Sequence, residues 1–308
     1  MTASSSRRGI GILGVGRHVP SRLLTNAEVE ERAGIPAGDI ERKTGVKSRY
    51  IATEKDTASG LSVPASLEAI ANAGISAEDL TSILACTFTA DYVMPALACK
   101  VHQLIGAKNA CALNLMADRL AADPAQKFGL VLGTALQSRF VNWQDPDSCM
   151  YFGDGVGAAV LGPVPEGYGF LAHDVYTNSS VYEAVRIRGG GSSFPLRPSN
   201  IEEGLNFYEI NGMEVWKQVV QHQPVVIRRA LSKAGLTTDD VDFFIFHQAN
   251  LNLINFLMGK LKLPLDKTHA NVERFGNTAE ASMAMALAEA VELKKIKHGD
   301  IVVISGVG

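Results

Sequence analysis

One helix–strand unit occurs twice in this chain, and this repeat constrains the fold more than any other feature of the sequence. The stretch AIANAGISAEDLTSILACT, which begins at Ala69, matches ALSKAGLTTDDVDFFIFHQ, which begins at Ala230, with a constant offset of 161 positions. Each copy holds a helix end, a glycine, a Ser or Thr that can cap the next turn, an acidic pair and an apolar run. The duplication indicates two similar halves, which we place at residues 1–165 and 166–308.

Continuous apolar runs alternate with amphipathic helices along both halves. Strands covered on both faces are continuously apolar, and helices such as VPASLEAIANAG and QPVVIRRALSKAG end at a glycine cap. This alternation predicts an α/β fold built in layers. The apolar runs are SILACTF (82–88), KFGLVLG (127–133), DVDFFIFHQ (240–248) and DIVVISG (300–306).

The first half is shorter than its repeat requires. When DIVVISG, from Asp300, is set against FGLVLGT, from Phe128, the offset is 172 instead of 161, so the first half is short by 11 residues. The shortage falls after Cys86, most plausibly at Ala117–Asp118, where the sequence passes from a strand end to mid-helix without turn or cap residues. We expect the sequence as written to omit a segment there. A real deletion is the alternative, and two normally bonded residues, with Cα atoms ~3.8 Å apart, would favour it.

Charge and composition exclude several classes of function. The net charge is -3 and the isoelectric point is near 6.2, which disfavours a nucleic-acid binder. No apolar run reaches the ~18 residues that span a bilayer. Arg7 and Arg8 precede a short glycine-rich apolar run, which we interpret as a first strand and not as an export signal. Four cysteines without metal-ligand spacing predict a cytoplasmic protein without disulfides or bound metal: Cys86, Cys99, Cys111 and Cys149.

Three motifs could carry chemistry. FHQAN (246–250) places His247 where a buried strand ends, the edge at which α/β folds bind ligands, although a purely structural histidine remains open. ERFGNTAEAS (273–282) places Asn277 on a glycine turn before a helix expected from Thr278 to Lys297. Asn277 could cap the helix, or its amide could face developing negative charge. YFGDGVGAAVLG (151–162) resembles a phosphate loop, but a strand follows it, so tight backbone packing is the better interpretation.

Together these motifs resemble the β-ketoacyl-ACP synthase III-like condensing enzymes of the thiolase superfamily. The resemblance covers essentially the whole chain and includes KTGVKSRYIA (43–52), FGDGVGAAVL (152–161), NGMEVWK (211–217), HQAN (247–250) and GNTAEAS (276–282). It implies a five-layered αβαβα fold of two duplicated halves, usually a homodimer.

The resemblance also implies a Cys-His-Asn triad. His247 and Asn277 match its second and third members. The Cys, at the N-terminus of a buried helix that lowers its pKa, would fall in the missing segment after Ala117. The family also continues past Gly308 into a glycine-rich turn that helps to build the oxyanion hole. By the same resemblance Gly212, Asn250 and Phe275 bind substrate, and Met94 closes the acyl pocket of the partner subunit, with a buried core position as the alternative for Met94.

The coenzyme A site departs from the family pattern. Asp39 and Pro146 stand where the family commonly places a Trp and an Arg, and Lys43 and Asn252 replace two further arginines. We therefore expect weak binding of free coenzyme A and a preference for acyl groups on the phosphopantetheine arm of an acyl carrier protein. Plausible docking charges for that acidic carrier, or else ordinary surface residues, are Lys217, Lys260 and Lys262.

The predicted function is a condensing enzyme that loads an acyl group on Cys and joins it to a second thioester, with loss of CO2, in polyketide or fatty-acid biosynthesis. A plain acyltransferase to an alcohol, amine or second carrier is the first alternative. A catalytically degenerate interaction subunit is the second, and it is favoured if the missing segment holds no Cys. Retention of both His247 and Asn277 favours condensation.

Overall fold

The first half forms a five-stranded mixed sheet. The computed structural model describes residues 9–112 and 125–307, and the strand order of this sheet is β1-β7-β6-β4-β5. β4 runs parallel to β5 and β6, whereas β7 is antiparallel to both β1 and β6. The bounds are β1 (Ile10–His18), β4 (Leu80–Cys86), β5 (Cys111–Ala112), β6 (Phe128–Ala135) and β7 (Gly155–Pro163). The apolar run near the N-terminus is thus the expected first strand.

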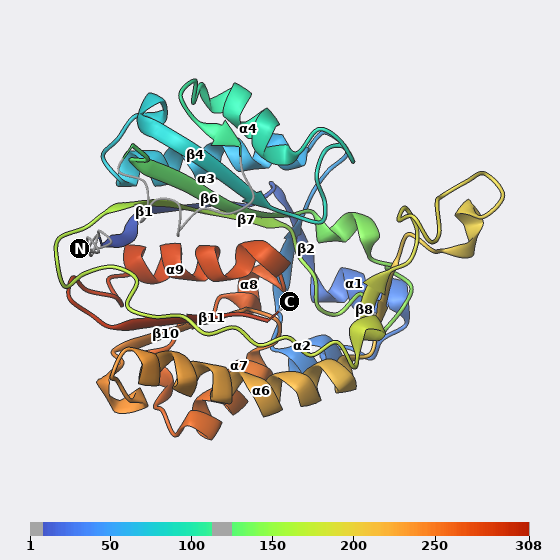
Figure 1. The fold of residues 1–308 in the computed structure, drawn as a ribbon. Helices are drawn as coiled ribbons and strands as arrows, with labels where there is room; N and C mark the ends of the chain where they lie inside the picture. The colour runs from blue at the N-terminus through green and yellow to red at the C-terminus, as the bar shows by residue number, and fades with distance from the viewer. Residues whose placement is uncertain (1–8, 113–124, 308) are drawn as a thin grey trace.

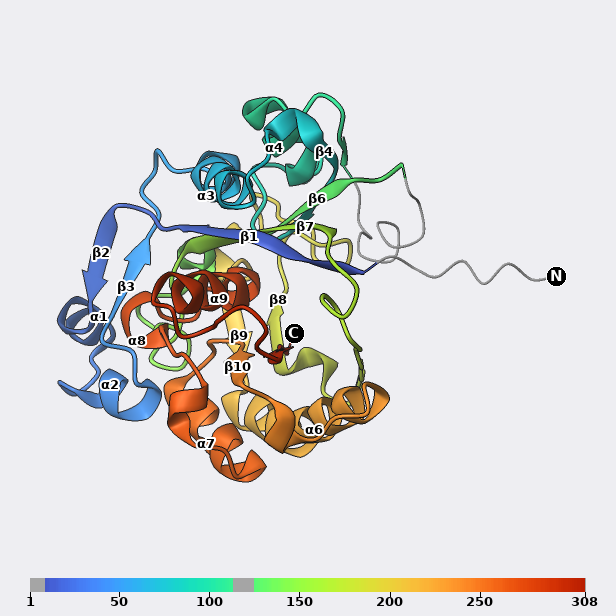
Figure 2. The same cartoon turned by 90° about the vertical axis from the view of Figure 1, so that its left-hand side faces the viewer.

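Five layers stack in the order helix, sheet, helix, sheet, helix (Figure 1). The helices α3 (Ala58–Asn72) and α4 (Leu97–Ile105) cover the outer face of the first sheet. The helix α9 (Ser282–Glu292) lies between that sheet and the parallel pair β10 (Phe243–Phe246) and β11 (Val302–Ser305), as Figure 2 shows from the side. The outer helices α6 (Gly212–Lys233) and α7 (Leu251–Leu261) complete the stack. This is the predicted αβαβα arrangement.

The predicted repeat is visible as the same local structure in both halves. The helix α3 leads through the 3-10 turn η1 (Ala77–Asp79) into β4, and α6 leads through η5 (Thr238–Asp240) into β10. A capping box opens each turn, because Ser76 and Thr237 both donate their backbone N–H, at 2.8 Å, to the carboxylate three residues later. The Ser or Thr and the Asp identified in the sequence therefore form the same cap in both halves.

Glycines let α9 and its preceding turn lie directly on the first sheet. A Cβ atom on Gly157 would lie 2.7 Å from the carbonyl oxygen of Ala281, and one on Gly153 would lie 2.0 Å from that of Phe275. A Cβ on Gly133, in β6, would lie 2.2 Å from the carbonyl oxygen of Glu280. The glycine-rich segment 151–162 thus serves close backbone packing, as the sequence analysis favoured.

Smaller elements, among them β2, α1 and β8, lie at the right of the layers in Figure 1. β2 pairs with β3 and β8 with β9, both antiparallel. Their bounds, with those of the short helices, are β2 (Arg22–Thr25), β3 (Ser48–Ile51), β8 (Val185–Ile187), β9 (Tyr208–Ile210), α1 (Asn26–Ala33), α2 (Asp39–Thr44) and α8 (Val272–Phe275). Among the described helices none is long and apolar enough to cross a membrane.

The short junction of the first half, Ala117–Asp118, lies outside the described residues. The expectation that a segment is missing there therefore stays a prediction.

Candidate active site

His247 lies at the carboxyl end of β10 with its imidazole directed at the start of α9. Its Nδ1 atom is 2.6 Å from the Oγ atom of Ser282, and its backbone N–H donates to the carbonyl oxygen of Ser305 at 3.0 Å. Burial disfavours the imidazolium and lowers the pKa of His247 to about 4. The side chain is therefore neutral at pH 7.

The contact with Ser282 is compatible with the tautomer that carries its proton on Nε2. Ser282 Oγ accepts the backbone N–H of Gln248 at 3.3 Å, and its own hydrogen can be donated to Nδ1 of His247. A proton donated to Nδ1 leaves the ring's proton on Nε2. The imidazole then presents an N–H donor, which is the group needed to stabilise an oxyanion.

Asn277 is fixed by its backbone and by one end of its side chain. Its N–H donates to the carbonyl oxygen of Tyr151 at 2.8 Å, and its own carbonyl oxygen accepts the N–H of Gly153 at 3.1 Å. The Oδ1 atom accepts the N–H of Ala279 at 2.9 Å, an Asx-type turn. The Oδ1 acceptor of the Asn277 amide is used in this turn. The Nδ2 donor of the same amide is the end that can bind a ligand.

The same turn delays the helix that follows. Ala279 has a φ of 41°, a 3-10 turn η7 (Ala279–Ala281) comes next, and regular helix begins at Ser282 and ends at Glu292. The helix expected from Thr278 to Lys297 is therefore shorter at both ends. The turn brings Asn277 and the Ser282–His247 contact to one short stretch at the carboxyl ends of β6 and β10, the edge at which α/β folds bind ligands.

The other residues expected to bind substrate occupy different settings. Asn250 caps α7, since its Oδ1 accepts the N–H of Asn252 at 2.8 Å. Phe275 is buried with its ring 5.9 Å from that of Tyr50, and Gly212 is the exposed first residue of α6. Met94 is 85% exposed, which contradicts the buried-core alternative for it within the single chain.

The proposed docking lysines all lie at the surface. Lys217 is on α6 and pairs with Glu214 at 2.6 Å. Lys260 lies in the last turn of α7, and Lys262 caps that helix with a φ of 60°. Their exposure is compatible with docking and with a purely solvated role alike.

The positions that depart from the coenzyme A pattern are occupied by local contacts. The Nζ atom of Lys43 lies 3.2 Å from the carboxylate of Asp39, which also binds Arg42. Asn252 donates its side-chain N–H to the carbonyl oxygen of Lys43 at 2.8 Å. The cation and amide that could meet a nucleotide phosphate are thus already engaged.

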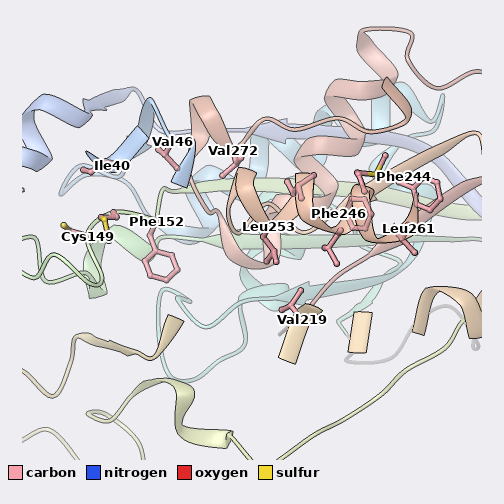
Figure 3. Close-up of a cluster of buried hydrophobic side chains, with 14 of the residues drawn as sticks. Ile40, Val46, Cys149, Phe152, Val219, Phe244, Phe246, Leu253, Leu261 and Val272 are labelled. Carbon is pink, nitrogen blue, oxygen red and sulfur yellow. The ribbon is translucent and has the colours of Figure 1, made fainter. Parts of the chain in front are cut away.

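The thiols of the buried Cys149 and of the exposed Cys86 have unfavourable settings for a nucleophile. Cys149 lies in the apolar cluster shown in Figure 3, and burial raises its pKa to about 11. Burial and the nearby carboxylate of Glu280 raise the pKa of Cys86, which ends β4. Cys99 and Cys111 are exposed, on α4 and at the start of β5. The expected position after Ala117 lies outside the described residues, and the sequence has no Cys between 112 and 148.

Two residues of the site were not predicted from the sequence. Ser282 closes the GNTAEAS motif, so its spacing from Asn277 was available as a signal, but its contact with His247 joins segments 35 positions apart. Glu280, in the same motif, contacts residues even more distant in sequence.

Comparison with known proteins identifies the family. The profile of 3-oxoacyl-[acyl-carrier-protein] synthase III matches residues 109–179, and that of its C-terminal part matches residues 231–308. β-Ketoacyl-[acyl-carrier-protein] synthase III of Desulfitobacterium hafniense is 35% identical over 311 residues, covering 97% of this chain and 94% of the relative. The Symbiobacterium thermophilum enzyme is 36% identical over 313 residues, covering 98% and 95%.

Solved structures agree with the sequence relatives. The 3-oxoacyl-[acyl-carrier-protein] synthase III of Aquifex aeolicus has a TM-score of 0.88 at 31% identity, covering 97% of this chain and 96% of that one. The priming β-ketosynthase of the R1128 polyketide pathway has a TM-score of 0.87 at 27% identity, covering 97% and 92%.

The lengths of these alignments bear on the short first half. The alignments with the Desulfitobacterium and Symbiobacterium relatives extend over 311 and 313 positions, which is more than the 308 residues of this chain. Both relatives therefore have residues that this chain lacks, in agreement with the shortage calculated from the repeat. With its fold, its motifs and its full-length relatives in agreement, this chain belongs to the β-ketoacyl-acyl carrier protein synthase III family of condensing acyltransferases.

Proposed function

We propose that His247 and Asn277 activate a malonyl-type thioester that is carried on an acyl carrier protein. The thioester carbonyl oxygen would accept hydrogen bonds from Nε2 of His247 and Nδ2 of Asn277. The bond to the carboxylate carbon breaks, CO2 leaves, and the electron pair passes to an enolate held by the two donors. The enolate carbon then attacks the carbonyl carbon of an acyl thioester and expels its thiolate. The supporting observation is the neutral imidazole that Ser282 holds by its Nδ1 atom.

Carbon–carbon bond formation separates this function from simple acyl transfer. Incubation with a malonyl carrier and an acyl thioester should release CO2 and yield a β-ketoacyl product with the summed carbon skeleton. His247→Ala and Asn277→Ala should each abolish CO2 release. Transfer of the acyl group to an alcohol, amine or second carrier without CO2 would instead support the plain acyltransferase.

One observation favours a second candidate, the catalytically degenerate subunit. The stretch that would supply the acylated Cys, residues 112–148, contains none. Intact mass after incubation with an acyl thioester measures whether any residue is acylated. If the protein forms no acyl adduct and releases no CO2, it is the degenerate subunit. If it releases CO2 without forming an adduct, only the activation of the malonyl group is retained.

A preference for carrier-bound over coenzyme A substrates follows from the contacts around Lys43. Because the Lys43 ammonium pairs with Asp39 and the Asn252 amide donates to the Lys43 carbonyl oxygen, the adenine and phosphate end of coenzyme A would find few partners. We expect the acyl carrier to be the better donor by kcat/KM, and charge reversal of the docking lysines Lys217 and Lys260 to weaken its binding. A high-affinity reaction with acyl-coenzyme A that ignores carrier-bound groups would overturn this preference.

A homodimer in the cytoplasm completes the proposal. Its support is an exposed apolar loop between β4 and α4, in which the exposed fractions are 84% for Phe88, 67% for Tyr92, 105% for Val93 and 85% for Met94. Such a contiguous apolar surface indicates a protein interface, and a partner would place Met94 beside its own acyl pocket. Sedimentation of the full chain tests this state, and a monomer at micromolar concentration would contradict it. The four free cysteines fit a reducing compartment.

A further inference from the structure

Glu280 joins three distant segments through one largely buried carboxylate. Its Oε1 atom accepts the backbone N–H of Phe88 at 3.0 Å, and its Oε2 atom accepts the side-chain N–H of Gln137 at 3.3 Å. Gln137 is fully buried, and its own oxygen accepts the hydroxyl hydrogen of Tyr208. The carboxylate thus connects the turn of Asn277 with the loop after β4, the loop after β6 and the strand β9.

A carboxylate at this position requires a reason beyond packing. Burial raises the pKa of Glu280, which is the signature of a group that loses hydration, and none of the described residues forms a salt bridge with it. Its neighbours in η7, Ala279 and Ala281, show that a small apolar side chain suits the turn. Burying a charge without a cationic partner is costly unless hydrogen bonds offset the cost. The role of Glu280 therefore lies in the hydrogen bonds that its carboxylate accepts.

The segment held by Glu280 has few other anchors. The side chain of Phe88 is 84% exposed, so packing does not fix its backbone. Thr89 supplies the second anchor, because its hydroxyl oxygen accepts the N–H of Leu136 at 2.9 Å. Beyond Thr89 a third anchor follows, because Asp91 accepts the backbone N–H of Ser59 at 3.0 Å. The chain then leads to the exposed Met94 and returns to buried positions at Leu97.

We propose that Glu280 is a positioning residue for acyl-chain selectivity, because its carboxylate fixes residues 87–89 at a set distance from the turn of Asn277. This inference rests on the proposed function, in which the malonyl thioester carbonyl binds at Asn277 and its enolate attacks an acyl thioester beside it. We place the acyl chain of that second thioester along the carboxyl ends of β4 and β6. The anchored segment forms a wall of that space. Its release widens the space and admits longer acyl chains.

The chain-length profile of Glu280→Ala tests the proposal. The ratio of kcat/KM for an eight-carbon over a two-carbon acyl thioester should rise by about 5- to 10-fold, as expected for the loss of one or two hydrogen bonds. Glu280→Gln should restore most of the profile, since its oxygen still accepts from Phe88 and its amide can pair with a flipped Gln137. The control is Glu292→Ala, at the far end of the helix α9 that follows η7, where the carboxylate is exposed and pairs, among the described residues, with Arg17; it should leave the profile unchanged. A folded Glu280→Ala enzyme with the wild-type profile would overturn the proposal.

Hydrogen exchange separates this proposal from the proposed function. The amide of Phe88 should exchange at least 5-fold faster in Glu280→Ala than in the wild type, whether or not the enzyme is active. An inactive wild-type chain would refute the proposed function, and unchanged exchange at Phe88 would refute the role of Glu280. If Glu280→Ala does not fold, Tyr208→Phe removes the hydroxyl that orients Gln137 and should shift both readouts in the same direction.

Discussion

Ser282→Ala is the substitution that most directly probes how His247 is held. It removes the hydroxyl 2.6 Å from Nδ1 of His247 and the acceptor of the Gln248 N–H, at a position that is fully buried. One hydrogen bond contributes about 0.5–1.5 kcal/mol net, so the preference for the Nε2–H tautomer weakens by that amount. Because 1.4 kcal/mol corresponds to a factor of ten, kcat for CO2 release should fall by roughly 2- to 10-fold. The free energy of unfolding should fall by about 1–3 kcal/mol.

The assay combines CO2 release from a malonyl carrier with 15N NMR of the imidazole, which reports the tautomer. Ser282→Thr retains the hydroxyl and should recover the tautomer. Ser66→Ala is the matched control, because Ser66 is equally buried, lies on α3 and has no hydrogen-bond partner for its Oγ within the described part of the chain. Full kcat with an unchanged tautomer in Ser282→Ala would refute the reasoning.

Three further predictions follow from pKa, charge and packing. The pKa of His247 is about 4 in the folded protein and about 6.5 in the unfolded chain, so the folded imidazole should stay neutral between these pH values and the acid limb of kcat should not show a pKa of 6.5. The contribution of His247 to the free energy of unfolding should decrease as pH falls from 6.5 to 4. Glu289→Ala leaves Asn271 and Arg274 without their carboxylate and should cost about 1–3 kcal/mol in chemical denaturation. Gly157→Ala forces a Cβ against Ala281. It should reduce the free energy of unfolding by about 1–3 kcal/mol, which is measured as a lower Tm.

Each of these predictions has a specific contrary result. An acid limb of kcat near 6.5 that disappears in a His247 variant would show that the imidazole is not buried as described. Wild-type stability in Glu289→Ala would show that its hydrogen bonds contribute nothing net. Gly191→Ala, where no atom lies within 4 Å of the added Cβ, is the control for Gly157→Ala, and equal effects of the two would refute the packing argument.

The repeat made the fold predictable because it joins local signals to a global arrangement. Ser76 with Asp79, and Thr237 with Asp240, are cap residues three positions apart, and both form the expected capping boxes. The continuous apolar runs became strands buried between helix layers, as a lack of alternation predicts. His247 at a strand end and Asn277 on a glycine turn were likewise visible, because strand ends and turns have local signatures.

The partners of these residues could not be predicted from sequence. The Ser282–His247 and Glu280–Phe88 contacts join segments 35 and 192 positions apart, so only the packing of α9 against both sheets creates them. The start of α9 was predicted too early because the amide of Asn277 binds Ala279, and this competes with regular helix at that point. Helix propensity alone does not register such a side-chain contact.

CO2 release from a malonyl-type thioester on an acyl carrier protein is the measurement that tests the central claim most directly. The full chain, supplied with the malonyl carrier and an acyl thioester, should release CO2 and form a β-ketoacyl product, and both His247→Ala and Asn277→Ala should lose this activity. Absence of CO2 in the wild type, or CO2 release that survives both substitutions, would contradict the role assigned to this pair.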